Sequence, residues 1–454
     1  MSELKIISQH AGSVLVGQLA VMAFGVADTV IAGRYSVAAL AALLVGSALY
    51  VSVYVGLIGI VQALLPIWAE MHGARQREAI GRSLRQSLYL CGLITAVGMT
   101  VLLFPGPLLR WAQVPELMLG EVQRYLTVLA FAFAPSLLFR VYGTFNQSLG
   151  RPLLVTGLQV GALMVKVPLS IWLVAGGGGI EPLGVVGCAW ATLVVNYLLV
   201  GLAVVMLRTQ ALYKPYRLWQ RMERPDWRQI GDFARLGIPG GLAYLVEVTS
   251  FTLMALFIAR LGTVATAGHQ IAASAAAVLY MMPLSMAIAC SARVSFWLGD
   301  NQPDRAKRVV VLGIKLTALA SMGLAAMVLI ANQWLASLYS GNPDIVLTGA
   351  ALLTWVALYH MADAMQALCA FLLRCYRITL APLLLYGVLL WGLGLYGGYQ
   401  LAYNGLAGRA ATQSASSFWA AGTGAISLVA ACLLALLWRA VRKSLPMTRA
   451  LKPA

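Results

Sequence analysis

The sequence predicts an all-α polytopic membrane protein whose twelve transmembrane helices form two six-helix bundles related by a pseudo-twofold axis along the membrane normal. Three observations carry this prediction: a strongly apolar composition, twelve long apolar runs, and similar short segments at a constant spacing. Of the 454 residues, 61% are hydrophobic and only 10% are charged, with a mean hydropathy of +0.82. Soluble domains carry about 25% charged residues, so this composition excludes an ordinary water-soluble protein.

Each predicted span is a continuous apolar run of about 20 residues, the length that an α-helix needs to cross the hydrocarbon core. Continuous runs favour helices, because the strands of a membrane β-barrel would alternate apolar and polar residues. Six runs precede a polar stretch rich in Arg and Trp, and six follow it. The runs lie at 11–33, 45–69, 87–105, 122–145, 153–175, 184–207, 237–261, 269–297, 310–331, 346–373, 380–402 and 416–438.

The distribution of Lys and Arg sets the predicted orientation. With a cytoplasmic N-terminus, five basic residues lie on the outer side: Arg34, Arg110, Arg124, Arg260 and Arg409. Lys166 lies inside a span, which leaves 26 of the 32 basic residues on the cytoplasmic side. This excess follows the positive-inside rule, so we expect a multi-pass membrane protein with both termini in the cytoplasm.

The distribution of Lys and Arg also explains the net charge of +17. The basic residues are spread over every inner loop, without the clustered stripe and interleaved aromatic residues of a nucleic-acid footprint. Attraction to anionic lipid of the inner leaflet explains the excess more simply. We therefore expect the lipid bilayer, and not nucleic acid, as the partner of these residues.

A weak internal repeat indicates two similar halves. The segment His72–Gln76 resembles Leu298–Gln302, and Gly150–Leu154 resembles Tyr376–Leu384, with Gly73 and Gly299 and likewise Arg151 and Arg377 separated by 226 positions. Six spans per half place both halves in the same orientation, as in transporters whose central cavity opens alternately to each side. The predicted organisation is an N-terminal bundle at 1–207, a cytoplasmic linker at 208–235 and a C-terminal bundle with a basic cytoplasmic tail at 236–454.

Three acidic residues lie inside predicted spans: Asp28 in span one, Glu247 in span seven and Asp363 in span ten. A charge at a helix centre costs about 2.5–3.5 kcal/mol on insertion scales, so each of these carboxyls requires a reason. They indicate an ion or proton site, or a counter-charge for a cationic substrate, with a structural pair as the alternative. For Lys166 two alternatives stay open: a salt bridge with Asp28, or a lysine that snorkels or is neutral.

Hydroxyl and aromatic side chains accompany the two carboxyls of the C-terminal half. Tyr359 and Gln366 share the helix face of Asp363. Around Glu247 lie three further candidates for a substrate cavity: Tyr244, Ser250 and Phe251. Carboxylates with hydroxyl oxygens suit Na⁺, a carboxyl in an apolar cavity suits H⁺, and aromatic faces beside carboxylates suit organic cations. Beyond Na⁺ at Glu247 and Asp363, no metal site or cofactor is expected.

Five segments resemble the multidrug and toxic compound extrusion (MATE) family of transporters, in its NorM-type branch. The similar segments are Phe24–Gly33, Leu183–Ala189, Leu245–Thr249, Ala267–Ala272 and Tyr359–Ala364. The resemblance implies an antiporter that exports cationic amphipathic compounds in exchange for Na⁺ or H⁺ by alternating access. It also implies that no cofactor is needed beyond the coupling ion, and that a monomer suffices, although the sequence does not determine the oligomeric state.

The resemblance assigns roles residue by residue. It implies that Glu247, Asp363 and Tyr359 form the cation site of the C-terminal bundle, and that Asp28 takes part in ion or proton coupling in the N-terminal bundle. This chain departs from the family where Lys166 and Ser170 replace two Asn residues that similar proteins often carry in span five. The positive charge of Lys166, a candidate partner of Asp28, weakens the case for Na⁺ binding there.

Two other functions are alternatives to this one. A lipid-linked oligosaccharide flippase of the same superfamily would need Arg and Lys residues lining its cavity, and only Lys166 qualifies. A membrane-embedded enzyme would need a polar catalytic cluster, such as paired His residues or a nucleophile with its base, and the sequence contains none. We therefore expect a transporter and not an enzyme.

Overall fold

The computed structural model describes residues 2–111, 115–177, 179, 181–405 and 410–449. Within these residues it contains twelve helical segments that are long and apolar enough to cross a membrane. The fold prediction of an all-helical polytopic protein is therefore confirmed. Arg409, which we expected in an outer loop, lies outside the described residues.

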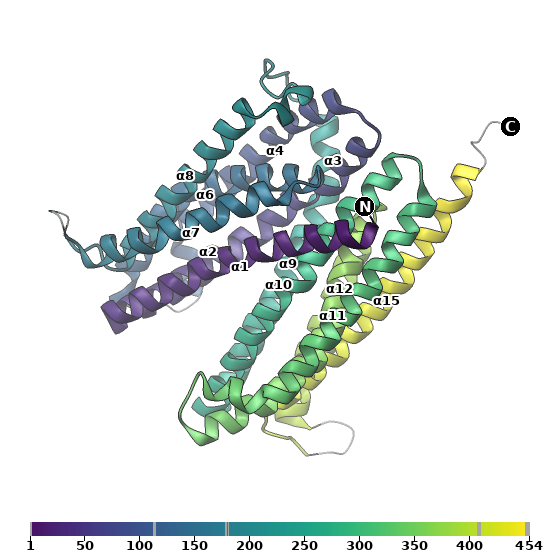
Figure 1. The fold of residues 1–454 in the computed structure, drawn as a ribbon. Coiled ribbons are helices and arrows are strands. Elements are labelled where there is room, and N and C mark those ends of the chain that lie inside the picture. The colour runs from purple at the N-terminus through teal and green to yellow at the C-terminus, as the bar shows by residue number, and fades with distance from the viewer. Residues whose placement is uncertain (1, 112–114, 178, 180, 406–409, 450–454) are drawn as a thin grey trace. The chain divides into compact units, whose positions relative to one another are not determined.

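The first six spans are built from eight helices (Figure 1). Their bounds are α1 (Glu3–Tyr35), α2 (Val37–Gln62), α3 (Leu64–Gly73), α4 (Arg77–Leu103), α5 (Gly106–Trp111), α6 (Glu116–Ser148), α7 (Pro152–Ala175) and α8 (Val185–Thr209). Helices α2 and α3 together form one span, and α5 is a single short turn between spans three and four.

A short 3₁₀ helix, η1 (Ala211–Tyr216), lies between the two halves. The last six spans are α9 (Trp227–Ala259), α10 (Thr263–Gly299), α11 (Pro303–Ser337), α12 (Pro343–Cys375), a composite eleventh span and α15 (Ala415–Arg449). The composite span joins α13 (Leu380–Tyr386), the π-helical η2 (Gly387–Tyr396), α14 (Gly397–Tyr399) and the π-helical η3 (Gln400–Asn404).

Several helix starts follow directly from local sequence. Proline opens α7, α11 and α12, a position where its missing N–H costs nothing and its φ angle is already helical. The hydroxyl of Ser36 caps α2 by accepting a hydrogen bond from the backbone N–H of Ala39 at 3.0 Å. Asn342 caps α12 in the same manner, accepting from the N–H of Asp344 at 2.9 Å.

Most helices extend beyond the apolar runs that predicted them. The clearest case is α9, which begins at Trp227, ten positions before the predicted run at 237–261. Its first turns are amphipathic, because Arg228 and Asp232 are exposed whereas Ile230 and Phe233 are buried. A helix can continue past the hydrocarbon core wherever one face packs and the other meets water, so apolar length marks the span and not the helix ends.

The two halves share one internal packing pattern, which follows the repeat in the sequence. In the first half the fourth span, α6, packs against α2, α4 and α8, the second, third and sixth spans. In the second half the tenth span, α12, packs against α10, α11 and α15, the eighth, ninth and twelfth spans. A shift of six spans converts one set of neighbours into the other. Each half is therefore the same kind of bundle, packed around its fourth span, which is α6 in the first half and α12 in the second.

The chain forms two compact units, and the first helix of each half begins in the unit of the other half. One unit comprises Val16–Gly241, and the other comprises Met1–Leu15 with Leu242–Ala454. Both crossing points fall inside a helix, α1 or α9, and the second lies 226 residues after the first, which is the spacing of the repeat. The domain boundaries predicted at 208–235 stay a prediction. The segment that connects α8 to α9 is shorter than that predicted linker and comprises 210–226.

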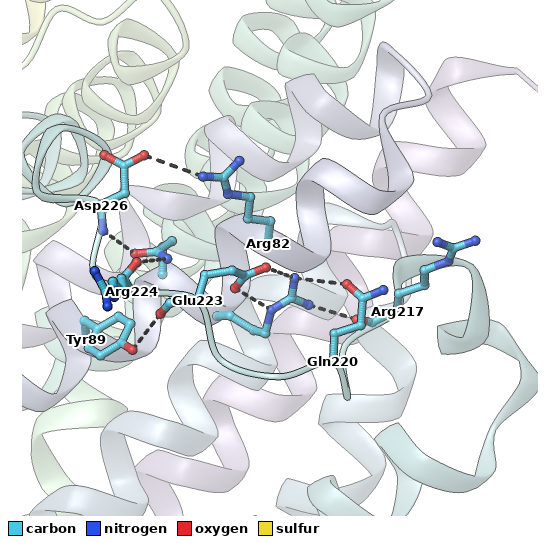
Figure 2. Close-up of polar contacts among 9 residues, drawn as sticks. Arg82, Tyr89, Arg217, Gln220, Glu223, Arg224 and Asp226 are labelled. Carbon is cyan, nitrogen blue, oxygen red and sulfur yellow. Dashed lines mark hydrogen bonds and ion pairs between the residues drawn. The ribbon is translucent and has the colours of Figure 1, made fainter.

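That segment docks on α4 within the unit Val16–Gly241 (Figure 2). The buried guanidinium of Arg85 forms a two-pronged ion pair with Glu223, through Nε–Oε2 at 2.8 Å and Nη2–Oε1 at 2.5 Å. Its Nη1 donates to the backbone carbonyl of Arg217 at 2.8 Å. The hydrogen bonds from Arg85 hold the pKa of the Glu223 carboxyl at about 2, below its ordinary value.

Backbone contacts extend this docking toward the start of α9. The side chain of Gln86 accepts from the N–H of Asp226 at 2.9 Å and donates to the carbonyl of Arg224 at 3.1 Å. The hydroxyl of Tyr89 donates to the carbonyl of Glu223 at 2.8 Å (Figure 2). Arg85, Gln86 and Tyr89, on one face of α4, thus bind the linker and make it part of this unit.

Candidate functional site

The two predicted carboxyls of the C-terminal half lie on neighbouring faces of α9 and α12. Asp363 is buried, with 5% of its surface exposed, and Glu247 is half-buried. The two groups are close enough for the charge of one to act on the other. Among the described residues, neither carboxyl forms an ion pair with a basic side chain. The structure therefore brings two acidic side chains into one region of the C-terminal unit, and no basic side chain among the described residues is ion-paired with either.

A hydrogen-bonded chain orients Asp363 from the eleventh span. The Gln366 side-chain nitrogen donates to Oδ1 of Asp363 at 2.9 Å, and the Tyr386 hydroxyl donates to the Gln366 side-chain oxygen. Gln366 and Tyr386 are both buried. Sequence analysis identified Gln366 from its position one turn after Asp363 but missed Tyr386, because a tyrosine in an apolar run carries no local signal of its partner.

Three aromatic rings meet about one helical turn from the carboxyls, and we call them the aromatic triad: Phe251, Tyr359 and Trp419. Their centroids are 5.8 Å apart for Phe251–Tyr359, 5.8 Å for Tyr359–Trp419 and 6.1 Å for Phe251–Trp419, all in edge-to-face orientation. The indole N–H of Trp419 donates to Nδ1 of His269 at 3.2 Å, which fixes the ring. Sequence analysis predicted the first two members, whereas Trp419 comes from the last span and was missed.

The aromatic triad lines a pocket within the C-terminal unit. Ser250, Phe251 and Met254 supply one wall from α9, and they follow Glu247 at helical spacing on the same face. The remaining lining residues come from α12, η2 and α15: Tyr359, Leu390, Gly394, Leu395, Phe418, Trp419 and Gly422. The pocket thus runs along the face of α9 that carries Glu247.

Of the residues predicted for a substrate cavity, Ser250 and Phe251 line this pocket. The other two, Tyr244 and Gln366, lie elsewhere in the unit. The Tyr244 ring packs against the guanidinium of the buried Arg374, whose central carbon is 5.5 Å from the ring centroid. Gln366 is engaged by Asp363 and Tyr386. Tyr244 was predicted to lie near Glu247 because it precedes it by three residues, and its ring contacts Arg374 at the C-terminal end of α12.

The π-helical eleventh span closes the pocket and holds α9. The indole N–H of Trp391 donates to the carbonyl of Val246, the residue before Glu247, at 3.2 Å, and the Tyr403 hydroxyl donates to the carbonyl of Phe257 at 2.7 Å. The eleventh span also lies close to α15. Glycine permits that approach, because a Cβ at Gly398 would lie 3.0 Å from the Cα of Phe418 in α15. Span eleven is therefore pinned on both sides of the pocket.

The N-terminal half contains a second acidic site, built on α1, α7 and α8. The Lys166 ammonium lies 2.7 Å from Oδ2 of Asp28, so of the two alternatives for this lysine the structure shows the salt bridge. Lys166 is 1% exposed and Asp28 is 7% exposed. The Lys166 ammonium also donates to the hydroxyl oxygen of Thr192 at 2.8 Å, and the Ser170 hydroxyl donates to Oδ1 of Asp28 at 3.2 Å.

Thr192 was not predicted from the sequence, although its role is simple. Its own proton goes to the carbonyl of Cys188 at 2.9 Å, so its lone pairs are left for the ammonium of Lys166. The ring of Phe24 lies on another side of that ammonium, 5.7 Å from Nζ to the ring centroid. A carboxylate, a hydroxyl oxygen and an aromatic ring therefore surround the positive charge.

Comparison with known sequences extends the resemblance to most of the chain. The MatE family model matches residues 14–172 and 239–400. The probable multidrug resistance protein NorM of Aromatoleum aromaticum is 37% identical over 434 residues, which cover 96% of this chain and 93% of that protein. The multidrug resistance protein PmpM of Pseudomonas aeruginosa is 31% identical over 401 residues, covering 88% and 84%.

Solved structures show the same fold at low sequence identity. The eukaryotic MATE transporter AtDTX14 superimposes with a TM-score of 0.86 at 20% identity, covering 98% of this chain and 99% of that chain. The Vibrio cholerae MATE transporter VcmN in the bent form gives a TM-score of 0.84 at 16% identity, covering 98% of each chain. The chain is therefore a member of the MATE family, which is a family of multi-pass membrane transporters and not of enzymes.

Proposed function

We propose that this protein is a multidrug efflux antiporter of the bacterial inner membrane, which exports cationic amphipathic compounds in exchange for Na⁺ or H⁺. The curated relatives named above support multidrug export, since both carry the name of multidrug resistance proteins. Support for the cationic substrate and for ion exchange comes from the site itself.

The observation that carries the proposal is the carboxyl pair of Glu247 and Asp363 beside the aromatic triad. Two acidic groups in a membrane-embedded bundle are costly without a counter-charge, so a cation supplied from outside the protein stabilises them. A small coupling ion binds the carboxylate oxygens alone. An organic cation binds the same charge and also places its apolar surface against Phe251, Tyr359 and Trp419, gaining cation–π attraction.

Exchange follows from competition between the two cations for one negatively charged site. In the outward-facing state the coupling ion neutralises Glu247 and Asp363 and displaces the drug. In the inward-facing state the ion leaves, and the freed carboxylates attract the next drug molecule. Because each ligand lowers the affinity for the other by the same factor, an inward ion gradient drives outward transport of the drug.

The expected orientation is part of the proposal. We place both termini in the cytoplasm, since twelve spans return the chain to its starting side and 26 of the 32 basic residues then face the cytoplasm. A reporter fused to the C-terminus that is active only in the cytoplasm tests this placement. Activity of a periplasmic reporter at the same position would contradict it.

The flippase alternative is weaker on one specific observation. A pyrophosphate-linked lipid requires basic groups available to its phosphates, and Lys166 was the residue predicted for that role. Its ammonium is engaged by Asp28 at 2.7 Å and by Thr192 at 2.8 Å. The paired lysine offers no net positive charge to a phosphate.

The decisive experiment measures ethidium transport by the purified protein in proteoliposomes, with Na⁺ and pH gradients imposed separately. We expect one of the two gradients to drive ethidium transport, which identifies the coupling ion. Glu247→Gln and Asp363→Asn are each expected to reduce gradient-driven transport at least about tenfold. Each substitution removes a charge for which the ion and the drug compete, and a loss of about 1.4 kcal/mol of coupling free energy changes an equilibrium constant tenfold.

Asp344→Asn is the matched control, because Asp344 lies in the first turn of the same helix, α12, and is exposed. It makes the same chemical change without touching the carboxyl pair, and wild-type transport is expected. Wild-type rates of gradient-driven ethidium transport in Asp363→Asn would overturn the assignment of the site. Transport that neither gradient drives would overturn the antiport itself.

A further inference from the structure

We infer that Lys166 is a built-in cation: its ammonium occupies the cation site of the N-terminal bundle at Asp28 and keeps external Na⁺ out of it. The binding claim stands on the geometry of this cluster. Its consequence for transport, that the carboxyl pair of the C-terminal bundle alone exchanges ions, rests on the proposed function. It narrows the role expected for Asp28, from binding an external coupling ion to binding the ammonium of its own chain.

The surroundings of the Lys166 ammonium are those of a small-cation site. Oδ2 of Asp28 and the hydroxyl oxygen of Thr192 lie at 2.7 and 2.8 Å, and the Phe24 ring faces the charge from 5.7 Å. Ser170 satisfies the second oxygen of the carboxylate at 3.2 Å. Thr192 thus supplies an oxygen ligand to the ammonium, and Ser170 supports the carboxylate.

Because the cluster is buried, the Lys166 ammonium also excludes Na⁺ from it. Lys166 is 1% exposed and Asp28 is 7% exposed, so little of either charged residue meets solvent. One carboxylate and one ammonium give a neutral cluster. An added Na⁺ would place two positive charges against one carboxylate in a medium of low dielectric constant, or would displace an ammonium that the chain holds in place covalently. Both alternatives are costly, so the paired site does not compete for Na⁺.

The position of the ammonium also explains what a substitution would do. Residue 166 reaches the cluster from α7, two positions before Pro168, and the carboxylate meets it from α1. An Asn or Gln at position 166 removes the positive charge and offers an amide oxygen instead. Asp28, Thr192, Ser170 and the new amide then present oxygen atoms of the kind that bind a hard cation such as Na⁺.

The test uses the full-length protein with the carboxyl pair of the C-terminal bundle neutralised by Glu247→Gln and Asp363→Asn, so that binding there does not contribute. In this background the unfolding temperature is measured in Na⁺ and in K⁺ at equal ionic strength. With Lys166 in place, we expect no Na⁺-specific shift. With Lys166→Asn added, we expect Na⁺ to raise the unfolding temperature by about 3 °C at concentrations well above the dissociation constant.

Three further variants make the result unambiguous. Lys166→Gln keeps more of the side-chain volume and is expected to give the same Na⁺-specific shift. Asp28→Asn combined with Lys166→Met removes both charges and is expected to give none. If Lys166→Asn and Lys166→Gln unfold in K⁺, we expect Na⁺ present throughout purification to restore the folded yield, and failure of this rescue counts against the inference.

Two results would overturn the inference: a Na⁺-specific shift while Lys166 is present, or no Na⁺ effect once it is replaced. Neither depends on transport, because the background protein lacks the proposed exchange site. A failure of the proposed function, by contrast, appears as unchanged ethidium transport when Asp363 alone is replaced. The two failures are thus distinguishable.

Discussion

The two acidic sites of this transporter solve the same physical problem in opposite ways. In the N-terminal half, Asp28 is held by a buried ammonium of the same chain at 2.7 Å. In the C-terminal half, Glu247 and Asp363 lie close enough to influence each other, and the described residues supply no ion-paired partner to either. The first site is neutral within itself, whereas under the proposed function the second takes a cation from outside.

The difference teaches that a carboxyl inside a membrane is not by itself a sign of ion binding. What matters is whether the fold already supplies the opposite charge. A complete pair is a structural unit that is expensive to break, and an incomplete pair is a binding site that is expensive to leave empty. The same residue type therefore has different expected mutational consequences in the two halves.

The largest expected effect is on stability at the complete site. Asp28→Asn leaves the Lys166 ammonium buried without its counter-charge, and we expect it to destabilise the protein by about 3–5 kcal/mol. Removing both charges with Asp28→Asn and Lys166→Met should recover most of this loss. Asp363→Asn, which breaks no ion pair, is the matched change in the other half and is expected to cost far less. Thermal unfolding in detergent measures all three, and equal losses for the two single variants would break the comparison.

The next effect concerns substrate affinity at the incomplete site. Phe251→Leu removes one ring of the aromatic triad, and loss of a cation–π contact of about 0.5–2 kcal/mol should raise the KM for ethidium about 2- to 30-fold. The maximal rate and the ion dependence should change little, because both carboxyls remain. Phe257→Leu is the control, since Phe257 lies on the same helix but packs against Tyr399 and Phe418 outside the triad. An equal rise in KM for both variants would contradict a specific role for the triad.

A smaller effect tests how the neutral cluster is held together. Ser170→Ala removes the hydroxyl that donates to Asp28 at 3.2 Å, and we expect a loss of about 1 kcal/mol of unfolding free energy. In the Asp28→Asn, Lys166→Met background the same substitution should cost less, because the carboxylate it supports is gone. Thermal unfolding of the four proteins forms a double-mutant cycle. Additive losses would show that Ser170 acts independently of the pair.

The smallest effect is expected at the ion pair outside the membrane, where Arg85 holds Glu223 of the linker. The Glu223 side chain is 33% exposed, and in Glu223→Gln the Arg85 guanidinium keeps the carbonyl of Arg217 and gains an amide oxygen as acceptors. We therefore expect Glu223→Gln to cost about 1 kcal/mol or less, below the cost of Asp28→Asn. A loss as large as that of Asp28→Asn would contradict this ranking.

The pH dependence of this linker pair has a defined sign. The pKa of Glu223 is lowered to about 2 in the folded protein, so its stabilising contribution is fully present above the ordinary carboxyl pKa and is lost only as the pH falls toward 2. The difference in unfolding temperature between wild type and Glu223→Gln should therefore stay constant between about pH 6 and pH 8. A difference that vanishes in this interval would contradict the assignment.

Sequence analysis predicted the spans well because their signal is local. A run of about 20 apolar residues is stable in few environments other than a membrane. An acidic residue inside such a run is easily recognised among its apolar neighbours. Asp28, Glu247 and Asp363 were identified on that ground, and Gln366 and Tyr359 from helical spacing. The helix ends were less predictable, since the amphipathic start of α9 at Trp227 depends on what it packs against.

Contacts between distant spans were beyond the reach of local patterns. Tyr386 and Gln366 are 20 residues apart, and Trp419 and His269 are 150 residues apart. Nothing near Trp419 in the sequence distinguishes it from the other tryptophans of the spans. The choice between a paired and an unpaired Lys166 was open for the same reason, because its partner lies 138 residues away.

By itself the sequence determined the membrane setting, the number of spans, the repeat of 226 residues, the family and the three costly carboxyls, since each is written in composition, periodicity or short segments. Only the tertiary structure decided which carboxyl is already neutralised, which rings line the pocket, and that α1 and α9 each begin in the unit of the opposite half. The physical reason is that charge and burial are properties of residues along the chain, whereas pairing depends on how separate helices pack.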